Sequence, residues 1–131
     1  MLISHLPLLA HDFEVDGIYY NIISSNNRVE VTYKGSLHDS DYNEYTGDIA
    51  IPRIVNFNGV TYSVKSISDD AFNGCWDLTS IEIPSSVSLI EEFAFYGCKG
   101  LTSIEIPDSV EYIGEDVFDG CNDNLVITIL L

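Results

Sequence analysis

Polar and apolar residues alternate in short runs along this chain, and in its C-terminal half the runs recur at a fixed spacing. The heptapeptide Leu-Thr-Ser-Ile-Glu-Ile-Pro at 78–84 is repeated letter for letter at 101–107, and 14 of the 23 positions of 78–100 are identical in 101–123. The alternation inside each copy is the period-2 pattern of a half-buried strand. The repeat therefore predicts a solenoid whose 23-residue coils bury their apolar sides against one another.

Each predicted coil continues from its strand into an apolar step and a compact turn. Residues 92–96 are expected to form a short helical or 3₁₀ turn that buries its apolar side chains. Gly97 is expected to close this turn in a left-handed conformation. Stacking of successive coils then produces a buried aromatic column of Phe72, Phe95 and Phe118.

The three cysteines, Cys75, Cys98 and Cys121, also recur every 23 residues and form a second column. Free cysteine is among the most buried residue types, so buried thiols are expected here. A disulfide between adjacent coils is sterically conceivable, but three cysteines cannot all pair. A metal site is disfavoured because the spacing lacks a Cys-x₂-Cys element and the histidines lie far away in sequence.

Residues 11–65 carry a different pattern. The pairs Asp16-Gly17 and Asn58-Gly59 are typical of two-residue hairpin turns. The β-forming segments around them predict a three-stranded meander, a further strand and a hairpin, at 13–15, 18–23, 28–33, 48–51, 54–57 and 60–65. We expect 11–65 to be a β-rich cap on the N-terminal end of the stack, and 66–131 to be a short solenoid.

The repeated motif L-T-S-I-E-I-P-x-S-V-x-x-I-x-x-x-x-F-x-G-C resembles the BspA-like leucine-rich repeats of bacterial surface proteins, over about 64–129. The segment 13–22 also looks like the lead-in of such proteins from Bacteroides-type bacteria. The pattern departs from the family in one respect. In the family, glycine usually follows the isoleucine of an I-G-x-x-A-F segment. Here only Gly114 keeps this glycine, and Ser68 and Glu91 occupy the equivalent positions in the other coils.

This resemblance gives the expected fold class and a first functional hypothesis. The fold would be mainly β with short helical turns, a leucine-rich repeat solenoid of 23-residue period capped by an N-terminal β-hairpin and meander unit. The resemblance implies a secreted or cell-surface module for protein binding and adhesion. A purely structural role, as one segment of a longer surface protein, is a further alternative.

The charge of the chain limits the partners that it can bind. Twenty-one acidic residues against five basic ones give a formal net charge of −16, which repels phosphate backbones and anionic lipid headgroups, so nucleic acid is excluded as a partner. The apolar stretch 1–10 is about half the roughly 20 residues of a membrane span, so no membrane insertion is expected. We interpret 1–10 as the remnant of a secretory signal peptide.

The outward side chains of the predicted strands are the main candidate binding site. Ser80, Glu82, Ser103 and Glu105 alternate with isoleucines that point into the core, so they must face outward. Residues 66–131 hold 13 acidic residues and one basic residue, which gives this half a net charge of −12. An extracellular or surface protein with a basic face is therefore the expected partner.

Tyrosines in the N-terminal unit support an alternative function. Exposed aromatic rings can stack on sugar rings, and Tyr19, Tyr20, Tyr42 and Tyr45 are crowded into this unit. Carbohydrate binding through this cluster is therefore the alternative hypothesis. Tyrosine is also a normal strand residue, so packing within the sheet explains the same pattern.

Other chemistry is weakly supported by the sequence. Asp39, Asp41 and Asn43 match the first oxygen-ligand positions of a calcium loop, but Glu44 and Ala50 occupy positions that need glycine and a bidentate glutamate. We therefore expect a solvated acidic loop, with no metal and no cofactor. The sequence contains no G-x-S-x-G element and no nucleophile paired with a histidine, so we do not expect an enzyme.

The chain finishes with an apolar segment at 127–131 and no polar capping coil. An uncovered strand edge of this kind invites pairing. We expect either that the array is truncated here, or that the edge supports self-association or is covered by a partner.

Overall fold

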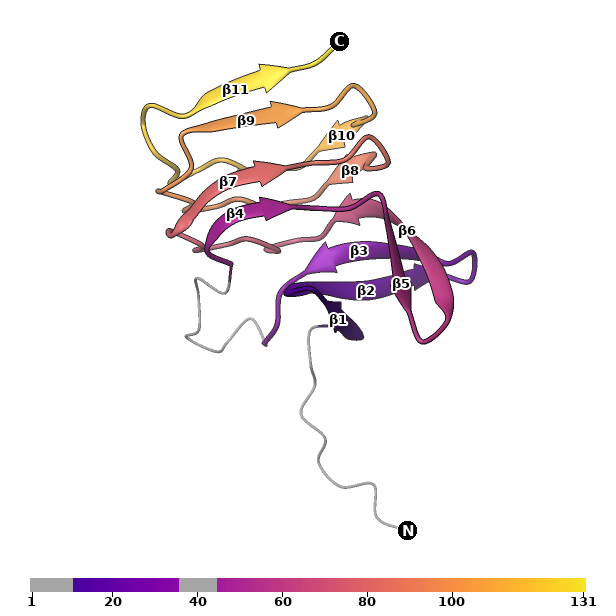
Figure 1. Cartoon of the computed structure of the whole chain (residues 1–131). Coiled ribbons are helices and arrows are strands. Elements are labelled where there is room, and N and C mark those ends of the chain that lie inside the picture. The colour runs from indigo at the N-terminus through magenta and orange to yellow at the C-terminus, as the bar shows by residue number, and fades with distance from the viewer. Residues whose placement is uncertain (1–10, 36–44) are drawn as a thin grey trace.

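The computed structural model describes residues 11–35 and 45–131, so the proposed signal-peptide remnant lies outside the described residues. The described chain forms a stack of coils that rises from an N-terminal β unit to the C-terminus (Figure 1). The strands are β1 (Phe13–Val15), β2 (Ile18–Ser24), β3 (Arg28–Thr32), β4 (Gly47–Ala50), β5 (Ile54–Phe57), β6 (Val60–Ile67), β7 (Leu78–Glu82), β8 (Leu89–Ile90), β9 (Ser103–Ile106), β10 (Tyr112–Ile113) and β11 (Val126–Ile129).

One sheet joins the N-terminal unit to the solenoid. Strands β1, β2 and β3 form the predicted antiparallel meander, and Asp16 and Gly17 make its first turn with φ angles of 51° and 82°. β3 then pairs in parallel with β6, and the sheet continues through β8 and β10. The predicted boundary between residues 65 and 66 falls within β6, and the division into 11–65 and 66–131 stays a prediction.

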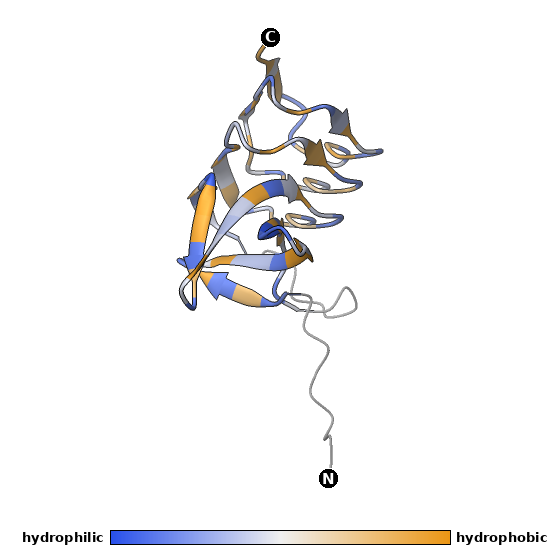
Figure 2. Cartoon of the chain, turned by 90° about the vertical axis from the view of Figure 1, so that its right-hand side faces the viewer, coloured by the Kyte–Doolittle hydropathy of each residue, from blue (hydrophilic) through white to orange (hydrophobic). Residues whose placement is uncertain are grey.

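The 23-residue repeat forms the coils of a solenoid, as predicted. Residues with hydrophobic and hydrophilic side chains alternate along the strands (Figure 2), and Ile81 and Ile104 are buried at equivalent positions. The aromatic column is present at the centre of the stack. The ring of Phe95 stacks on that of Phe72 at 5.1 Å and on that of Phe118 at 5.9 Å, with interplanar angles of 11° and 5°. Each coil thus completes the core of its neighbour.

The helical or 3₁₀ turn expected over 92–96 is present as a compact hydrogen-bonded turn but not as a helix, since the described residues contain no helix. Within this segment Tyr96 N–H donates to the carbonyl of Phe93, whereas Phe95 N–H donates to Val117 in the next coil. Phe93 also has a φ of 59°, which no right-handed helix can contain. Gly97 does adopt the expected left-handed conformation, with a φ of 73°.

The backbone–backbone hydrogen bonds that join 70–74 to 92–96 and 93–97 to 115–119 all run in one direction. Each joins an N–H of one coil to a carbonyl of the following coil. Asp70, Phe72 and Gly74 donate to Glu92, Ala94 and Tyr96 at 3.1, 2.7 and 2.7 Å. Phe93, Phe95 and Gly97 donate to Glu115, Val117 and Asp119 at 3.1, 3.1 and 2.8 Å.

The cysteine column lines the inside of the turns. Cys75 and Cys98 are buried, as expected, and Cys121 in the last coil is half-buried. The thiol of Cys98 donates to the carbonyl of Phe72 at 3.1 Å, and that of Cys121 to Phe95 at 3.0 Å. These thiols therefore join adjacent coils as polar core contacts.

Candidate functional site

Strands β4, β7, β9 and β11 lie side by side along one side of the stack, and we call their outward surface the strand face (Figure 1). Parallel pairing places Asp48 opposite Ser80 and Ala50 opposite Glu82. The side chains of Glu82, Ser103 and Glu105 are exposed, and Ser80 is half-buried. The predicted outward orientation is thus found, and the role of these residues in binding stays a prediction.

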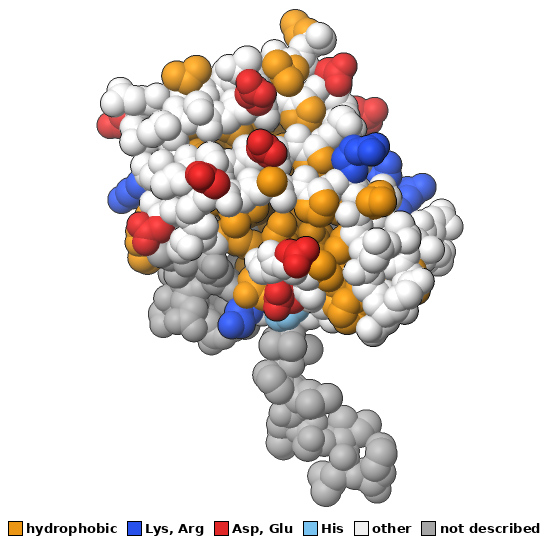
Figure 3. Space-filling model, viewed as in Figure 1, with side chains coloured by type: hydrophobic (Ala, Val, Ile, Leu, Met, Phe, Trp, Pro, Cys, Tyr) orange, Lys and Arg blue, Asp and Glu red, His pale blue; other side chains and the backbone are white. Residues whose placement is uncertain are grey.

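The four predicted residues line one shallow groove of about 430 Å³ on the strand face. Its other lining residues are Ile81, Ile83, Ile104, Pro107 and Leu130. The groove therefore combines apolar residues with hydroxyl and carboxylate groups from two successive coils. Acidic side chains are scattered over this side of the molecule among apolar ones (Figure 3).

Asp48 is a member of the strand face that the sequence analysis missed. Its Oδ1 accepts hydrogen bonds from Ser80 Oγ at 2.8 Å and Thr79 Oγ1 at 2.9 Å. These hydrogen bonds lower the pKa of the Asp48 carboxyl below its ordinary value, so it is ionised at neutral pH. The strand face therefore carries a third carboxylate, in the row of Ser80 and Ser103, two residues along the strand from the row of Glu82 and Glu105.

A sequence pattern could have identified this residue. Asp48-Ile49-Ala50-Ile51-Pro52 follows the same x-Ile-x-Ile-Pro pattern as residues 80–84. The sequence analysis placed this strand in the N-terminal cap. The structure pairs β4 with β7 in parallel, which makes β4 the first strand of the stack.

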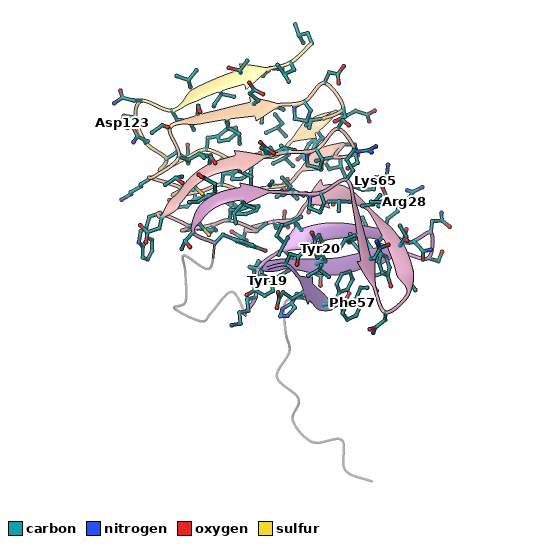
Figure 4. The ribbon with its side chains drawn as sticks, in the orientation of Figure 1. Tyr19, Tyr20, Arg28, Phe57, Lys65 and Asp123 are labelled. Carbon is teal, nitrogen blue, oxygen red and sulfur yellow. The ribbon has the colours of Figure 1, made fainter. Side chains whose placement is uncertain are left out.

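The tyrosine cluster does not form an exposed platform, which corrects the basis of the carbohydrate hypothesis. Tyr20 and Tyr45 are 1% and 2% exposed, so their ring faces cannot stack on a sugar. Tyr45 packs against Phe72 at 4.5 Å and donates its hydroxyl to the carbonyl of Thr32. Tyr19, beside Tyr20 on β2, is half-buried (Figure 4), and Tyr42 lies outside the described residues.

The remaining predicted sites are only partly covered by the structure. Asp39, Asp41 and Asn43 lie outside the described residues. Within 11–35 and 45–131, no three His, Cys, Asp or Glu side chains are grouped so that they could hold a metal ion. The same part of the chain contains no helix that could span a membrane. All four residues of β11 are exposed, and self-association through this edge stays a prediction.

Two solved structures of leucine-rich repeat proteins share this architecture. The chain is 30% identical to a leucine-rich repeat protein from Bacteroides ovatus, with a TM-score of 0.68 over 91% of this chain and 37% of that one. It is 25% identical to a leucine rich cell surface protein from Faecalibacterium prausnitzii, with a TM-score of 0.68 over 95% of this chain and 32% of that one. The chain thus spans about a third of the length of each.

A third structure supports the fold alone. A leucine-rich repeat protein from Bacteroides capillosus is 21% identical, with a TM-score of 0.59 over 91% of this chain and 98% of that one. No protein with a curated description matches the chain in sequence.

The family model for the BspA type leucine rich repeat region matches residues 54–130 in 6 copies. This match covers more than half of the chain and includes β5 and β6, which precede the two similar copies at 78–123. It agrees with the stacked parallel strands, the aromatic column and the left-handed Gly97 described above. The chain therefore belongs to the BspA-type leucine-rich repeat family.

Proposed function

We propose that this chain is a non-enzymatic recognition module, secreted or displayed at the cell surface, that binds a basic protein surface through the strand face. One observation carries the proposal. Ser80, Glu82, Ser103 and Glu105 line a single groove, and their carboxylates are exposed on rigid, parallel-paired strands. A site held by strands presents its charges with little conformational freedom, so binding loses little conformational entropy.

The strand face offers a repeating pattern rather than a single pocket. Glu82 on β7 and Glu105 on β9 repeat one carboxylate from coil to coil, although β7 and β9 belong to separate two-stranded sheets and are not hydrogen-bonded to each other. Lys or Arg side chains on a regular partner surface can therefore contact successive coils. Because the carboxylates are exposed, they accelerate association more than they add affinity, and both effects weaken as salt rises.

The location is supported by the family and by one relative. The Faecalibacterium prausnitzii structure is that of a leucine rich cell surface protein. Adhesion is the form of protein binding that fits such a location. We propose the same location for this chain.

A charge-reversal experiment tests the strand face. The full chain carrying Glu82→Lys and Glu105→Lys is compared with wild type in a pull-down from a panel of extracellular-matrix and serum proteins. The matched control carries Glu111→Lys and Asp119→Lys, which are exposed acidic residues outside the groove and make the same change in net charge. Thermal melts confirm that each variant is folded.

We expect the strand-face variant to lose binding and the control to keep it. Equal loss in both variants would show that net charge alone attracts the partner, which contradicts the proposal. Retention of binding in the strand-face variant would place recognition elsewhere. Absence of binding by the folded wild-type chain would favour a purely structural role.

A further inference from the structure

A second concave surface lies between the hairpin of β1 and β2 and the segment that runs from β4 into β5. This groove has a volume of about 460 Å³, within the range of roughly 300–1,000 Å³ that is usual for ligand sites. Its apolar lining residues are Val15, Ile18, Ala50, Pro52, Ile54 and Val55. Asp16, Asn56 and Tyr20 are its polar members. We call it the hairpin groove.

The Tyr20 side chain forms part of this groove although it is 1% exposed (Figure 4). No described residue makes a hydrogen bond with its hydroxyl, in contrast to the hydroxyl of Tyr45, which donates to Thr32. Among the described residues, Ser86 Oγ is the one side-chain oxygen that is both fully enclosed and without a hydrogen-bond partner. The Tyr20 oxygen also lacks a partner, so it is not fully enclosed and stays accessible from the groove. A ligand acceptor at this opening would give the Tyr20 hydroxyl a hydrogen-bond partner.

The electrostatics of the groove favour a neutral donor beside an anionic rim. Burial, and then the nearby Asp16 carboxylate, raise the pKa of the Tyr20 hydroxyl. The hydroxyl therefore stays protonated and can donate. Asp16 itself is exposed at the hairpin turn, where it can face a cationic group.

A strand edge borders the same groove. β4 pairs with β7 on one side, and no strand in the described part of the chain pairs with its other side. Ala50, the last residue of β4, lines the groove. Backbone groups on such an edge can hydrogen-bond to an extended segment of another protein.

We propose that the hairpin groove binds an extended peptide segment of a partner protein. A large aliphatic side chain enters the groove, a peptide carbonyl accepts a hydrogen bond from the Tyr20 hydroxyl, and a neighbouring Lys or Arg faces Asp16. The net charge of −16 disfavours an anionic lipid, and the buried ring of Tyr20 offers no face to a sugar. This site is separate from the strand face and does not depend on the function proposed for it.

Peptide titrations of the full chain, followed by amide chemical shifts, test the proposal. The probe is acetyl-Gly-Arg-Leu-Arg-Gly-amide, and its control has alanine in place of leucine with the same charges. We expect saturable shifts at Ile18, Ala50 and Ile54 with the leucine peptide only. Tyr20→Phe should weaken binding by about 3- to 10-fold, as expected for loss of one neutral hydrogen bond. Tyr62→Phe, at a half-buried tyrosine outside the groove, should leave the affinity unchanged.

Three results would overturn the proposal. The first is equal affinity for the leucine and alanine peptides, because the aliphatic side chain would then contribute nothing. The second is wild-type affinity in Tyr20→Phe. The third is loss of peptide binding in the Glu82→Lys and Glu105→Lys variant, because the peptide would then be bound by the strand face. Retained peptide binding in that variant, together with lost pull-down, would separate the two sites.

Discussion

Replacing Phe95 with alanine removes the central ring of the aromatic column and tests whether the coils depend on one another. Phe95 is fully buried and stacks on one ring above and one below, at 5.1 and 5.9 Å. Loss of its transfer free energy is worth about 2–3 kcal/mol, and each stacked pair adds about 0.5–1.5 kcal/mol. With partial collapse of the cavity, the free energy of unfolding should fall by about 3–5 kcal/mol.

Urea denaturation followed by circular dichroism measures this loss. With a slope of about 2 kcal/mol/M, a loss of about 4 kcal/mol lowers the midpoint by about 2 M. Phe118→Ala is the matched control, because Phe118 is half-buried and stacks on Phe95 alone. It should cost less than half as much. Should Phe95→Ala not fold, Phe95→Leu keeps part of the volume and should show a smaller loss.

The reasoning would be refuted by a loss below about 1 kcal/mol for Phe95→Ala, which is too small for a buried aromatic ring. It would also be refuted if Phe118→Ala cost as much as Phe95→Ala. Either result would mean that the stacking register between the coils is not the one described.

Two further substitutions test the packing between coils. Partial desolvation, a side-chain hydrogen bond with Glu92 and neighbouring carboxylates raise the pKa of the Asp69 carboxyl to about 6, above the ordinary value of 3.8, although the residue is exposed. The unfolded chain therefore releases this proton at lower pH than the folded chain, and ionised Asp69 destabilises the fold at pH 7. Asp69→Asn should therefore melt at a higher temperature than wild type at pH 7. In melts across a pH series, this difference in melting temperature should vanish as the pH falls from 6 to 4. A difference that stays constant with pH would contradict the argument. Gly114→Ala should lower the free energy of unfolding, measured by urea denaturation, by about 1–3 kcal/mol. The reason is that the new Cβ would lie 2.6 Å from the backbone nitrogen of Glu92 in the preceding coil. An unchanged urea midpoint would show that the two coils can separate at this position.

The sequence predicts the coils because each residue that builds them recurs at the same spacing. The period of 23 places Phe72, Phe95 and Phe118 in one column before any coordinates are known. The period does not identify Asp48, because Asp48 lies 32 residues, and not 23, before its strand neighbour Ser80. The β5–β6 hairpin is inserted between the two strands and hides the period.

Local patterns also fail where the outcome depends on contacts between distant residues. The turn at 92–96 has the length and composition of a short helix, yet its N–H groups bond alternately within the coil and across to the next coil. Likewise, nothing in the sequence near Tyr20 and Tyr45 shows which side of the meander the first coil covers. Their burial follows from that coverage, so residue type alone did not predict it.

The one-way hydrogen bonds between the turns give this layer of the stack a donor end and an acceptor end. In the last coil the equivalent donors are the N–H groups of Asp116, Phe118 and Gly120, and no described residue accepts a hydrogen bond from them. A segment that extends this layer must therefore present backbone carbonyl groups to the N–H groups of the last coil. Two copies that met through their C-terminal ends would place donors against donors, so a symmetric dimer through the turns is disfavoured, whereas head-to-tail addition matches the polarity of the backbone.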